Sequence, residues 1–184
     1  MAQTINITFP TMLGNVNIYA NPTQQRKAEQ LLKKTPEILN QAYLNTANRF
    51  GERLARMAKT CLRRGMPPPN SGVSWPPHAA STTRRLGAHT LLYWSTQYYH
   101  AIGVYKRGKY VFVGVRSNTK KTRPDGSNPS GLTLTQVAKI LEFGGGKVPA
   151  RPLWIPLLDS VGGKAQFKQE LVKEIRKQMR KYTQ

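Results

Sequence analysis

The chain has 184 residues, and its 29 Lys and Arg residues against 8 Asp and Glu residues give a formal net charge of +21. This charge excludes a neutral cytosolic enzyme of ordinary design. It points to a polyanion or an acidic protein as partner, bound in a salt-sensitive way, with a merely solvated basic surface as the alternative. Hydrophobic residues make up 39% of the chain, which is enough for a core, so the chain as a whole is not disordered.

The cysteine count, the histidine spacing and the length of the apolar runs further limit what kind of protein this is. The single Cys61 excludes an intrachain disulfide and fits a reducing compartment. Its place on an apolar stripe favours packing over reactivity. No apolar run approaches the ~20 residues that cross a bilayer, and the N-terminus lacks a basic-then-apolar secretion signal. His78, His89 and His100 are not at metal-ligand spacing, so we expect no metal site. We also expect no cofactor, and no membrane as a partner.

The first part of the chain predicts two strands and then helix. Alternating apolar and polar residues indicate that residues 1–21 form a hairpin or an arm. Asn21-Pro22 is typical of a helix start, because a capping side chain precedes a proline whose missing N–H costs nothing. Thr35-Pro36 repeats the signal, so we expect a kink and a second helix over about residues 36–64. Gly65 is placed to end it at the C′ position.

The middle of the chain predicts a loop and a hairpin. Residues 66–80 hold five of the thirteen prolines, which predicts a loop that either packs through Trp75 or remains a mobile arm. Residues 86–94 predict a short helix passing into a strand. Residues 98–105 and 109–116 predict a hairpin, with Lys106-Arg107-Gly108 as the turn. Its aromatic residues, interleaved with cations, could stack nucleic-acid bases, although we favour a half-buried sheet with cross-strand aromatic pairs.

A basic loop follows the hairpin. Residues 117–131 predict an exposed, mobile loop, because glycines, prolines and polar residues dominate them. The cations of this loop and of the hairpin turn suit a phosphate backbone or an acidic protein. These candidate contacts are Lys106, Arg107, Lys109, Lys120, Lys121 and Arg123.

The C-terminal third predicts helices around a glycine turn. Thr133 is a cap for a helix spanning roughly residues 134–143. The apolar residues around Pro156 are expected to pack back on the core. Asp159 or Ser160 is expected to start the last helical region, with Gly162-Gly163 as a break. Its apolar stripe predicts docking on the sheet, with an anionic membrane as the alternative.

The stretch from Leu141 to Pro152 has the most unusual composition in the chain, with three glycines followed by two prolines. Glycine frees the backbone and proline stiffens it, so a helix end should run through a flexible turn into an extended arm. We expect Glu142, Lys147 and Arg151 to face outward from it, presented to a neighbouring molecule. The run of three glycines and Lys147 is not a phosphate-binding loop, because it lacks the GxxxxGK[ST] spacing and follows a helix. No two carboxylates are placed as a pair for general acid–base catalysis, so we do not expect an enzyme.

The same stretch resembles a signature of a phage family. Residues 138–144, 147–153 and 156–158 are similar to the "VEFG" and "PARPFLRPAL" patterns of neck, tail-completion or minor tail proteins of long-tailed double-stranded DNA bacteriophages. Leu141 stands where the pattern has valine, and Ile155 replaces its arginine. The resemblance covers roughly residues 36–184, with sharp motif support at 138–158. It leaves out the N-terminal arm and the Pro-rich insert.

The resemblance implies a structural virion protein without catalysis, assembled in the host cytoplasm. Such a protein forms a ring, as a hexamer or a dodecamer, at the head–tail junction. Its partners would be other neck proteins, tail terminator or connector subunits, with DNA in the channel. Ring contacts join different patches of neighbouring subunits. The expected inter-subunit interface comprises Glu142, Phe143, Gly144, Gly145, Gly146, Lys147, Pro149, Arg151 and Pro152.

The expected fold is therefore α+β, as a single domain over residues 1–184. An antiparallel β-sheet would be flanked by a long N-terminal helix, a short helix and a C-terminal amphipathic helix. An extended N-terminal arm and the Pro-rich loop complete it. The alternative function is a stand-alone basic nucleic-acid-binding protein, which the charge of +21 and the aromatic, cationic hairpin motivate.

Overall fold

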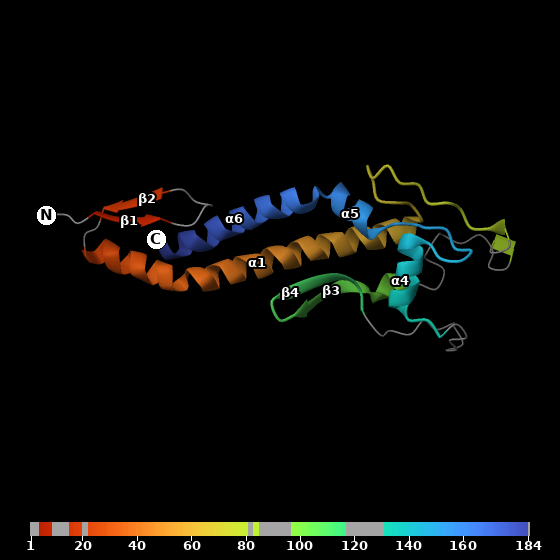
Figure 1. The fold of residues 1–184 in the computed structure, drawn as a ribbon, viewed down its shortest axis with the longest axis horizontal. Coiled ribbons are helices and arrows are strands. Elements are labelled where there is room, and N and C mark those ends of the chain that lie inside the picture. Colours follow the sequence, from red (N-terminus) through yellow and green to blue (C-terminus); the bar gives the residue numbers. More distant parts are fainter. Residues whose placement is uncertain are drawn as a thin grey trace. The chain divides into compact units, whose positions relative to one another are not determined.

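The structure is a computed structural model that describes residues 4–8, 15–19, 22–80, 83–84, 97–116 and 131–183. It confirms the α+β class (Figure 1). The strands are β1 (Thr4–Thr8), β2 (Asn15–Tyr19), β3 (Ile102–Arg107) and β4 (Tyr110–Val115). The helices are α1 (Pro22–Arg64), α3 (Gln97–Ala101), α4 (Leu134–Phe143), α5 (Trp154–Ser160) and α6 (Gly163–Thr183).

The chain divides into two compact units, and the boundaries fall within α1 and α6. The first unit comprises Met1–Tyr43 and Val172–Gln184, and the second comprises Leu44–Leu171. In the first unit, β1 and β2 pair antiparallel with Thr4 opposite Tyr19. Ile38 and Ala42 of α1 are buried there. The candidate site residues all belong to the second unit.

Helix α1 is a single element. The expected second helix start at Thr35-Pro36 is wrong, because α1 continues from Pro22 to Arg64 with Pro36 inside it. Proline forfeits its own N–H bond, but the turns on either side of it keep theirs. The predicted end is confirmed: Gly65 has φ 64°, and the N–H groups of Gly65 and Met66 bond the carbonyls of Leu62 at 3.2 Å and Cys61 at 3.1 Å. This is the Schellman arrangement that glycine favours at C′.

The second unit is built around the C-terminal half of α1. Phe50, Leu54 and Leu62 are buried along it. On one side lies the β3–β4 hairpin, which approaches so closely that a Cβ added at Gly51 would lie 2.9 Å from Cγ2 of Val113. On another side the ring of Phe50 meets that of Phe167 of α6 edge to face, with centroids 5.5 Å apart. Figure 1 shows α1 between the hairpin and α6.

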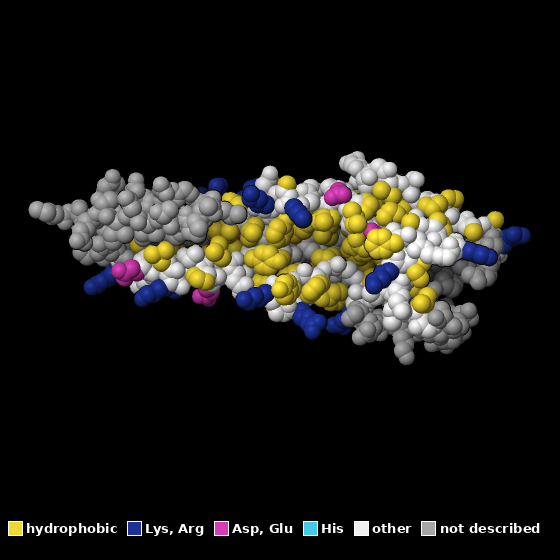
Figure 2. Space-filling model, viewed as in Figure 1, with side chains coloured by type: hydrophobic (Ala, Val, Ile, Leu, Met, Phe, Trp, Pro, Cys, Tyr) yellow, Lys and Arg dark blue, Asp and Glu magenta, His cyan; other side chains and the backbone are white. Residues whose placement is uncertain are grey.

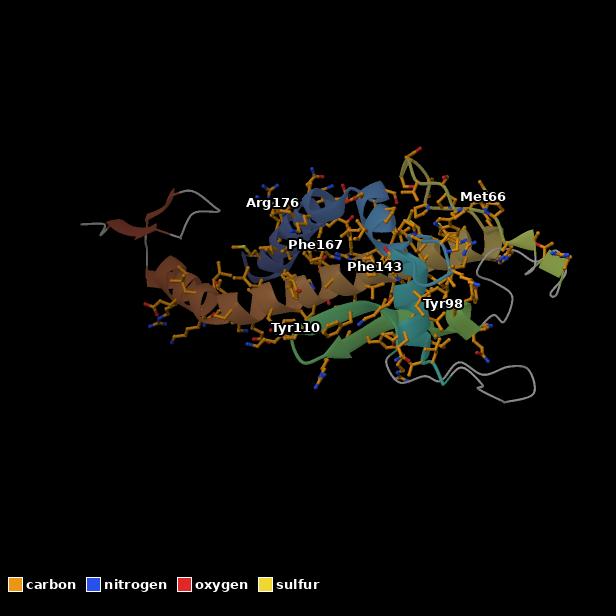
Figure 3. The ribbon with its side chains drawn as sticks, turned by 45° about the vertical axis from the view of Figure 1, so that its right-hand side comes forward. Met66, Tyr98, Tyr110, Phe143, Phe167 and Arg176 are labelled. Carbon is orange, nitrogen blue, oxygen red and sulfur yellow. The ribbon has the colours of Figure 1, made fainter. Side chains whose placement is uncertain are left out.

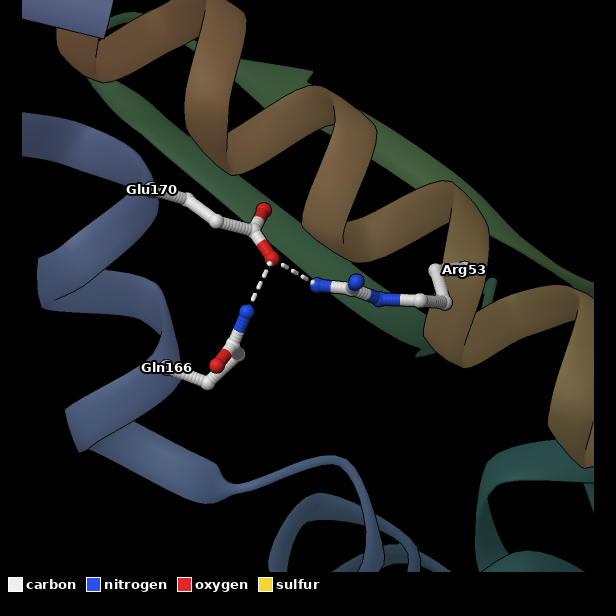
Figure 4. A network of polar contacts seen from close by, with 3 residues as sticks. All are labelled: Arg53, Gln166 and Glu170. Atoms are coloured by element: carbon white, nitrogen blue, oxygen red, sulfur yellow. Dashed lines mark hydrogen bonds and ion pairs between the residues drawn. The ribbon is translucent and has the colours of Figure 1, made fainter. Parts of the chain in front are cut away.

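Helix α6 is also tied to α1 by a charged contact (Figure 4). Arg53 Nη2 lies 2.6 Å from Glu170 Oε1, and Gln166 Nε2 donates to the same oxygen at 3.0 Å. Burial opposes ionisation of Glu170, but the hydrogen bonds from Arg53 and Gln166 and the charges of Arg53 and Arg49 lower its pKa. In this unit the C-terminal helix thus packs on α1 and not, as expected, on the sheet. Within the described helices, no stretch combines the length and apolar character needed to cross a bilayer.

Two local predictions differ from the structure. The segment expected to begin a strand at Tyr98 is helical over Gln97–Ala101, and β3 starts only at Ile102. Tyr98 is 6% exposed, so its burial in the core decides the local conformation over the β propensity of tyrosine. The last helical region does not start at Asp159 or Ser160 as expected: these residues end α5, and α6 starts at Gly163. The short helix and strand expected at residues 86–94 lie outside the described residues.

Candidate interaction surface

Helix α4 begins where the sequence predicts. Thr133 Oγ1 accepts the N–H of Gln136 at 3.2 Å, and Gln136 Oε1 accepts the N–H of Thr133 at 2.8 Å. This reciprocal capping box satisfies two helix N-terminal donors at once. It fixes the start of a helix whose last residues are Glu142 and Phe143.

The glycines after α4 make a tight reversal of the chain. Gly144 has φ 77°, and a Cβ there would lie 3.2 Å from the backbone nitrogen of Ala150. Gly145 and Val148 exchange two backbone hydrogen bonds of 3.0 and 2.9 Å, with Gly146 at φ 58° between them. The returning chain then donates the Arg151 N–H to the carbonyl of Leu141 at 2.6 Å. The expected flexible turn is therefore a closed, hydrogen-bonded one.

Glu142 does not face outward, so its predicted orientation is wrong. Its residue exposure is 9%, and its carboxylate accepts backbone N–H groups at the start of α5. The donors are Leu153 at 2.8 Å, Trp154 at 3.1 Å and Ile155 at 3.4 Å. The next residue, Pro156, has no N–H. Glu142 therefore satisfies the N-terminal donors of α5, and its negative charge lies where the helix dipole favours it.

Arg151 is also buried, at 5% exposure, and its predicted outward orientation is wrong. Its Nε and Nη2 each donate at 3.0 Å, to the carbonyls of Pro76 and Pro77. The Trp75 indole N–H donates to the carbonyl of Pro152 at 2.9 Å. Burial lowers the pKa of Arg151. Of the two alternatives for residues 66–80, the loop packed through Trp75 is confirmed.

These contacts form what we call the clamp: Glu142, Arg151 and Trp75 with the backbone groups they bind. Sequence reasoning missed it because Arg151 and its carbonyl partners are 74 and 75 residues apart. A usable signal was present. A buried tryptophan among prolines leaves carbonyls without local N–H partners, and a distant arginine can satisfy two of them with its planar fork.

The other predicted interface residues are on the surface. Gly145, Gly146, Lys147 and Pro149 are exposed, whereas Gly144 and Pro152 are half-buried. Phe143 is 73% exposed, Val148 40% and Ile155 62%. We call these three exposed side chains the apolar rim. Each belongs to a backbone segment that the hydrogen bonds described above hold in place. Figure 2 shows hydrophobic side chains gathered over the region of α4 and α5, and Figure 3 marks Phe143 at the end of α4.

The predicted charged contacts divide between described and undescribed residues. Lys106, Arg107 and Lys109 are exposed at the turn of the β3–β4 hairpin. Lys120, Lys121 and Arg123, and the loop of residues 117–131 apart from Gly131, lie outside the described residues. The hairpin packs on α1 through valines, whereas Tyr110 and Phe112 are 67% and 52% exposed.

Two buried titratable groups serve packing. Burial raises the pKa of Tyr98 to about 12, although a hydrogen bond from Trp154 acts against it. Cys61 is buried, and burial likewise raises the pKa of its thiol. Among the described side chains, no group of three or more His, Cys, Asp or Glu residues is placed to hold a metal ion.

Comparison with protein-family models, with curated proteins and with solved structures gives no match to this chain. The proposals below therefore depend on the residues and geometry described here and on the resemblance of residues 138–158.

Proposed function

We propose that this protein is a structural virion component of the phage head–tail junction. It oligomerises into a ring that joins the tail to the head connector around the DNA channel. Other neck proteins, tail terminator or connector subunits would be its neighbours. The observation that carries the proposal is a rigidly held apolar rim in the segment that resembles the phage signature.

The geometry supports an assembly role for this segment. Large exposed apolar side chains on a backbone that is already hydrogen-bonded make good interface anchors, because the backbone loses little conformational entropy when they bind. Phe143 follows directly on Glu142, whose carboxylate is fixed by three backbone donors. Val148 closes the bridge to Gly145, and Ile155 lies in the first turn of α5. The clamp therefore works inside the subunit so that the rim can contact a neighbour.

The test is the mass of the purified full-length protein in solution. Size-exclusion chromatography with light scattering over rising concentration should give a closed multiple of the subunit mass, and negative-stain electron microscopy should show rings with a central hole. Phe143→Ser and Ile155→Ser should each shift the population toward the monomer. Met66→Ser is the matched control, because Met66 is 60% exposed in the same unit but lies outside the rim.

Two results would count against this proposal. A monomer at every concentration, alone and with neck or connector proteins, would remove the ring. Equal loss of assembly in Met66→Ser and Phe143→Ser would show that any exposed apolar side chain has the same effect. The alternative function, a stand-alone nucleic-acid-binding protein, predicts salt-sensitive DNA binding by the monomer.

A further inference from the structure

The outer face of the β3–β4 hairpin is the second unexplained surface. The antiparallel register sets Tyr105 opposite Phe112 and Arg107 opposite Tyr110, so these four side chains share one face. Val104 and Val113 point the other way, against Gly51 of α1. The hairpin therefore has one packed face and one face of aromatic and cationic side chains directed away from α1.

The aromatic rings on this face are open to solvent and close together. Tyr110 is 67% exposed and Phe112 52%. Their ring centroids are 6.3 Å apart with a tilt of 48°, so they present neighbouring flat surfaces. Figure 3 marks Tyr110 near the hairpin turn. Exposed rings of this kind are what unpaired bases stack on in single-strand-binding proteins.

The segment that carries the rings also carries four exposed cations and no acid. Residues 97–116 contain no Asp or Glu, and Lys106, Arg107, Lys109 and Arg116 are all exposed. The guanidinium carbon of Arg116 lies 5.4 Å from the centroid of the Tyr105 ring. That ring is held in place because its hydroxyl donates to the carbonyl of Ala101 at 2.7 Å. The face thus joins a positive field to ordered planar groups.

A groove runs beside these groups. Its volume is about 640 Å³, and its walls include the cations Lys106, Arg107 and Arg116 and the rings of Tyr105 and Phe112. A volume of this size is within the ~300–1,000 Å³ range of ligand sites. A nucleotide brings a planar base and a phosphate, and the groove offers a partner for each.

The charge and the exposed rings of this face favour one class of ligand over the others. A second copy of the chain would bring another strongly positive surface, with Lys147 beside its apolar rim, and like charges oppose such docking. An acidic peptide would match the cations but offers no ring to stack on Tyr110 and Phe112. Duplex DNA offers phosphates but hides its base faces. Single-stranded nucleic acid matches both features.

We propose that the outer face of the β3–β4 hairpin binds single-stranded nucleic acid, with bases stacked on Tyr110 and Phe112 and phosphates near Arg107, Lys109 and Arg116. This inference goes beyond the ring proposal and does not rest on it. A chain that never assembles but still binds single strands through these rings would contradict the ring alone.

The experiment uses the full-length protein and two fluorescent probes of equal length, a single-stranded oligothymidylate and a duplex. Anisotropy titrations are run from low to moderate salt. The double variant Tyr110→Ala with Phe112→Ala should weaken single-strand binding by roughly tenfold or more, since stacking contributes ~1–3 kcal/mol per base. Its duplex affinity should change less than twofold. The ring-retaining pair Tyr110→Phe with Phe112→Tyr should bind single strands like the wild type.

A charge control separates stacking from general attraction. Lys164→Ala with Lys168→Ala removes two exposed cations from α6 and should weaken both probes alike. Arg107→Ala should lower the salt slope for the single strand by about 0.7, the value for one lost phosphate contact. Thermal unfolding of each variant checks the fold, which should be intact because the substituted side chains are exposed. The proposal fails if the aromatic double variant keeps wild-type single-strand affinity, or if polyglutamate displaces the oligonucleotide at lower concentration than oligothymidylate itself does.

Discussion

The α4–α5 segment and the β3–β4 hairpin both carry a glycine turn, nearby cations and exposed aromatic or apolar side chains, yet they are built in opposite ways. In the first, the charged residues Glu142 and Arg151 are buried, and their side chains hold backbone groups of two separate stretches, residues 153–155 and 76–77. In the second, Lys106 and Arg107 are exposed and bind nothing that holds the fold together in the described structure. The same residue types therefore stabilise the subunit in one place and are available to a partner in the other.

The difference teaches that burial, rather than sequence neighbourhood, assigns a role to a charge. A buried carboxylate or guanidinium needs several hydrogen bonds to offset the loss of water, so it becomes part of the architecture. An exposed one costs little and stays available to ligands. Substitutions should consequently affect stability in the clamp and binding in the hairpin.

The largest expected effect is at Glu142. Glu142→Ala leaves the N–H groups of Leu153, Trp154 and Ile155 without their acceptor, which should lower the free energy of unfolding by roughly 3 kcal/mol. Urea denaturation followed by circular dichroism measures it. Lys147→Ala, at an exposed site five residues away, should change stability by less than ~0.5 kcal/mol. Equal midpoints for the two variants would refute the clamp.

Arg151 should come next. Arg151→Ala leaves the carbonyls of Pro76 and Pro77 without their donor and should cost about 2 kcal/mol. Arg151→Lys should recover only part of this, because a single ammonium cannot reproduce the planar fork. Urea denaturation followed by circular dichroism measures the loss. An Arg151→Ala protein of unchanged stability would show that the Pro-rich loop is held by other contacts.

The packing of the β3–β4 hairpin against α1 can be tested at Gly51. A Cβ there would lie 2.9 Å from Val113 Cγ2, so Gly51→Ala should destabilise by about 1 kcal/mol net, despite the better helix propensity of alanine. In a Val113→Ala background the same change should become neutral or stabilising. A double-mutant cycle of unfolding free energies gives the coupling. Additive effects would mean that the hairpin does not pack against α1 at this point.

The smallest effect belongs to a partly exposed charged pair, Arg53 and Glu170. The folded-state pKa of Glu170 is lowered, so its contact with Arg53 adds stability above the ordinary pKa near 4.5 and loses it as the pH falls through the folded value. Glu170→Gln should cost less than ~1 kcal/mol at pH 7, because solvent reaches both side chains, which are 37% and 21% exposed, and screens the pair. The difference from wild type should shrink toward zero in acid. A difference that is constant with pH would assign the effect to packing.

The sequence predicts the elements whose signals are local. Thr133 with Gln136 defines the start of α4, Gly65 defines the end of α1, and Gly108 lies in the hairpin turn, because each depends on residues within one turn of chain. The sequence does not predict the local conformation where contacts between residues far apart in the chain determine it. Tyr98 becomes helical because it is buried, and α5 forms at Pro156 because Glu142 caps it.

The site shows the same limit. The sequence correctly singles out residues 141–152 as unusual, since glycine and proline mark special backbone wherever they occur. It assigns the wrong orientation to Glu142 and Arg151, because their partners are brought in by folding. The exposure of Phe143 and Ile155, which carries the assembly proposal, is likewise a property of the packed unit.

The most direct test is to compare Phe143→Ser with Glu142→Gln in parallel by sedimentation velocity and urea unfolding. The account predicts that the Phe143 variant unfolds with the wild type but loses the assembled species. The Glu142 variant should unfold at lower urea, yet still assemble while it remains folded. The reverse pattern, with Phe143→Ser destabilised and Glu142→Gln assembling poorly at full stability, would contradict a clamp that acts within the subunit and a rim that acts between subunits.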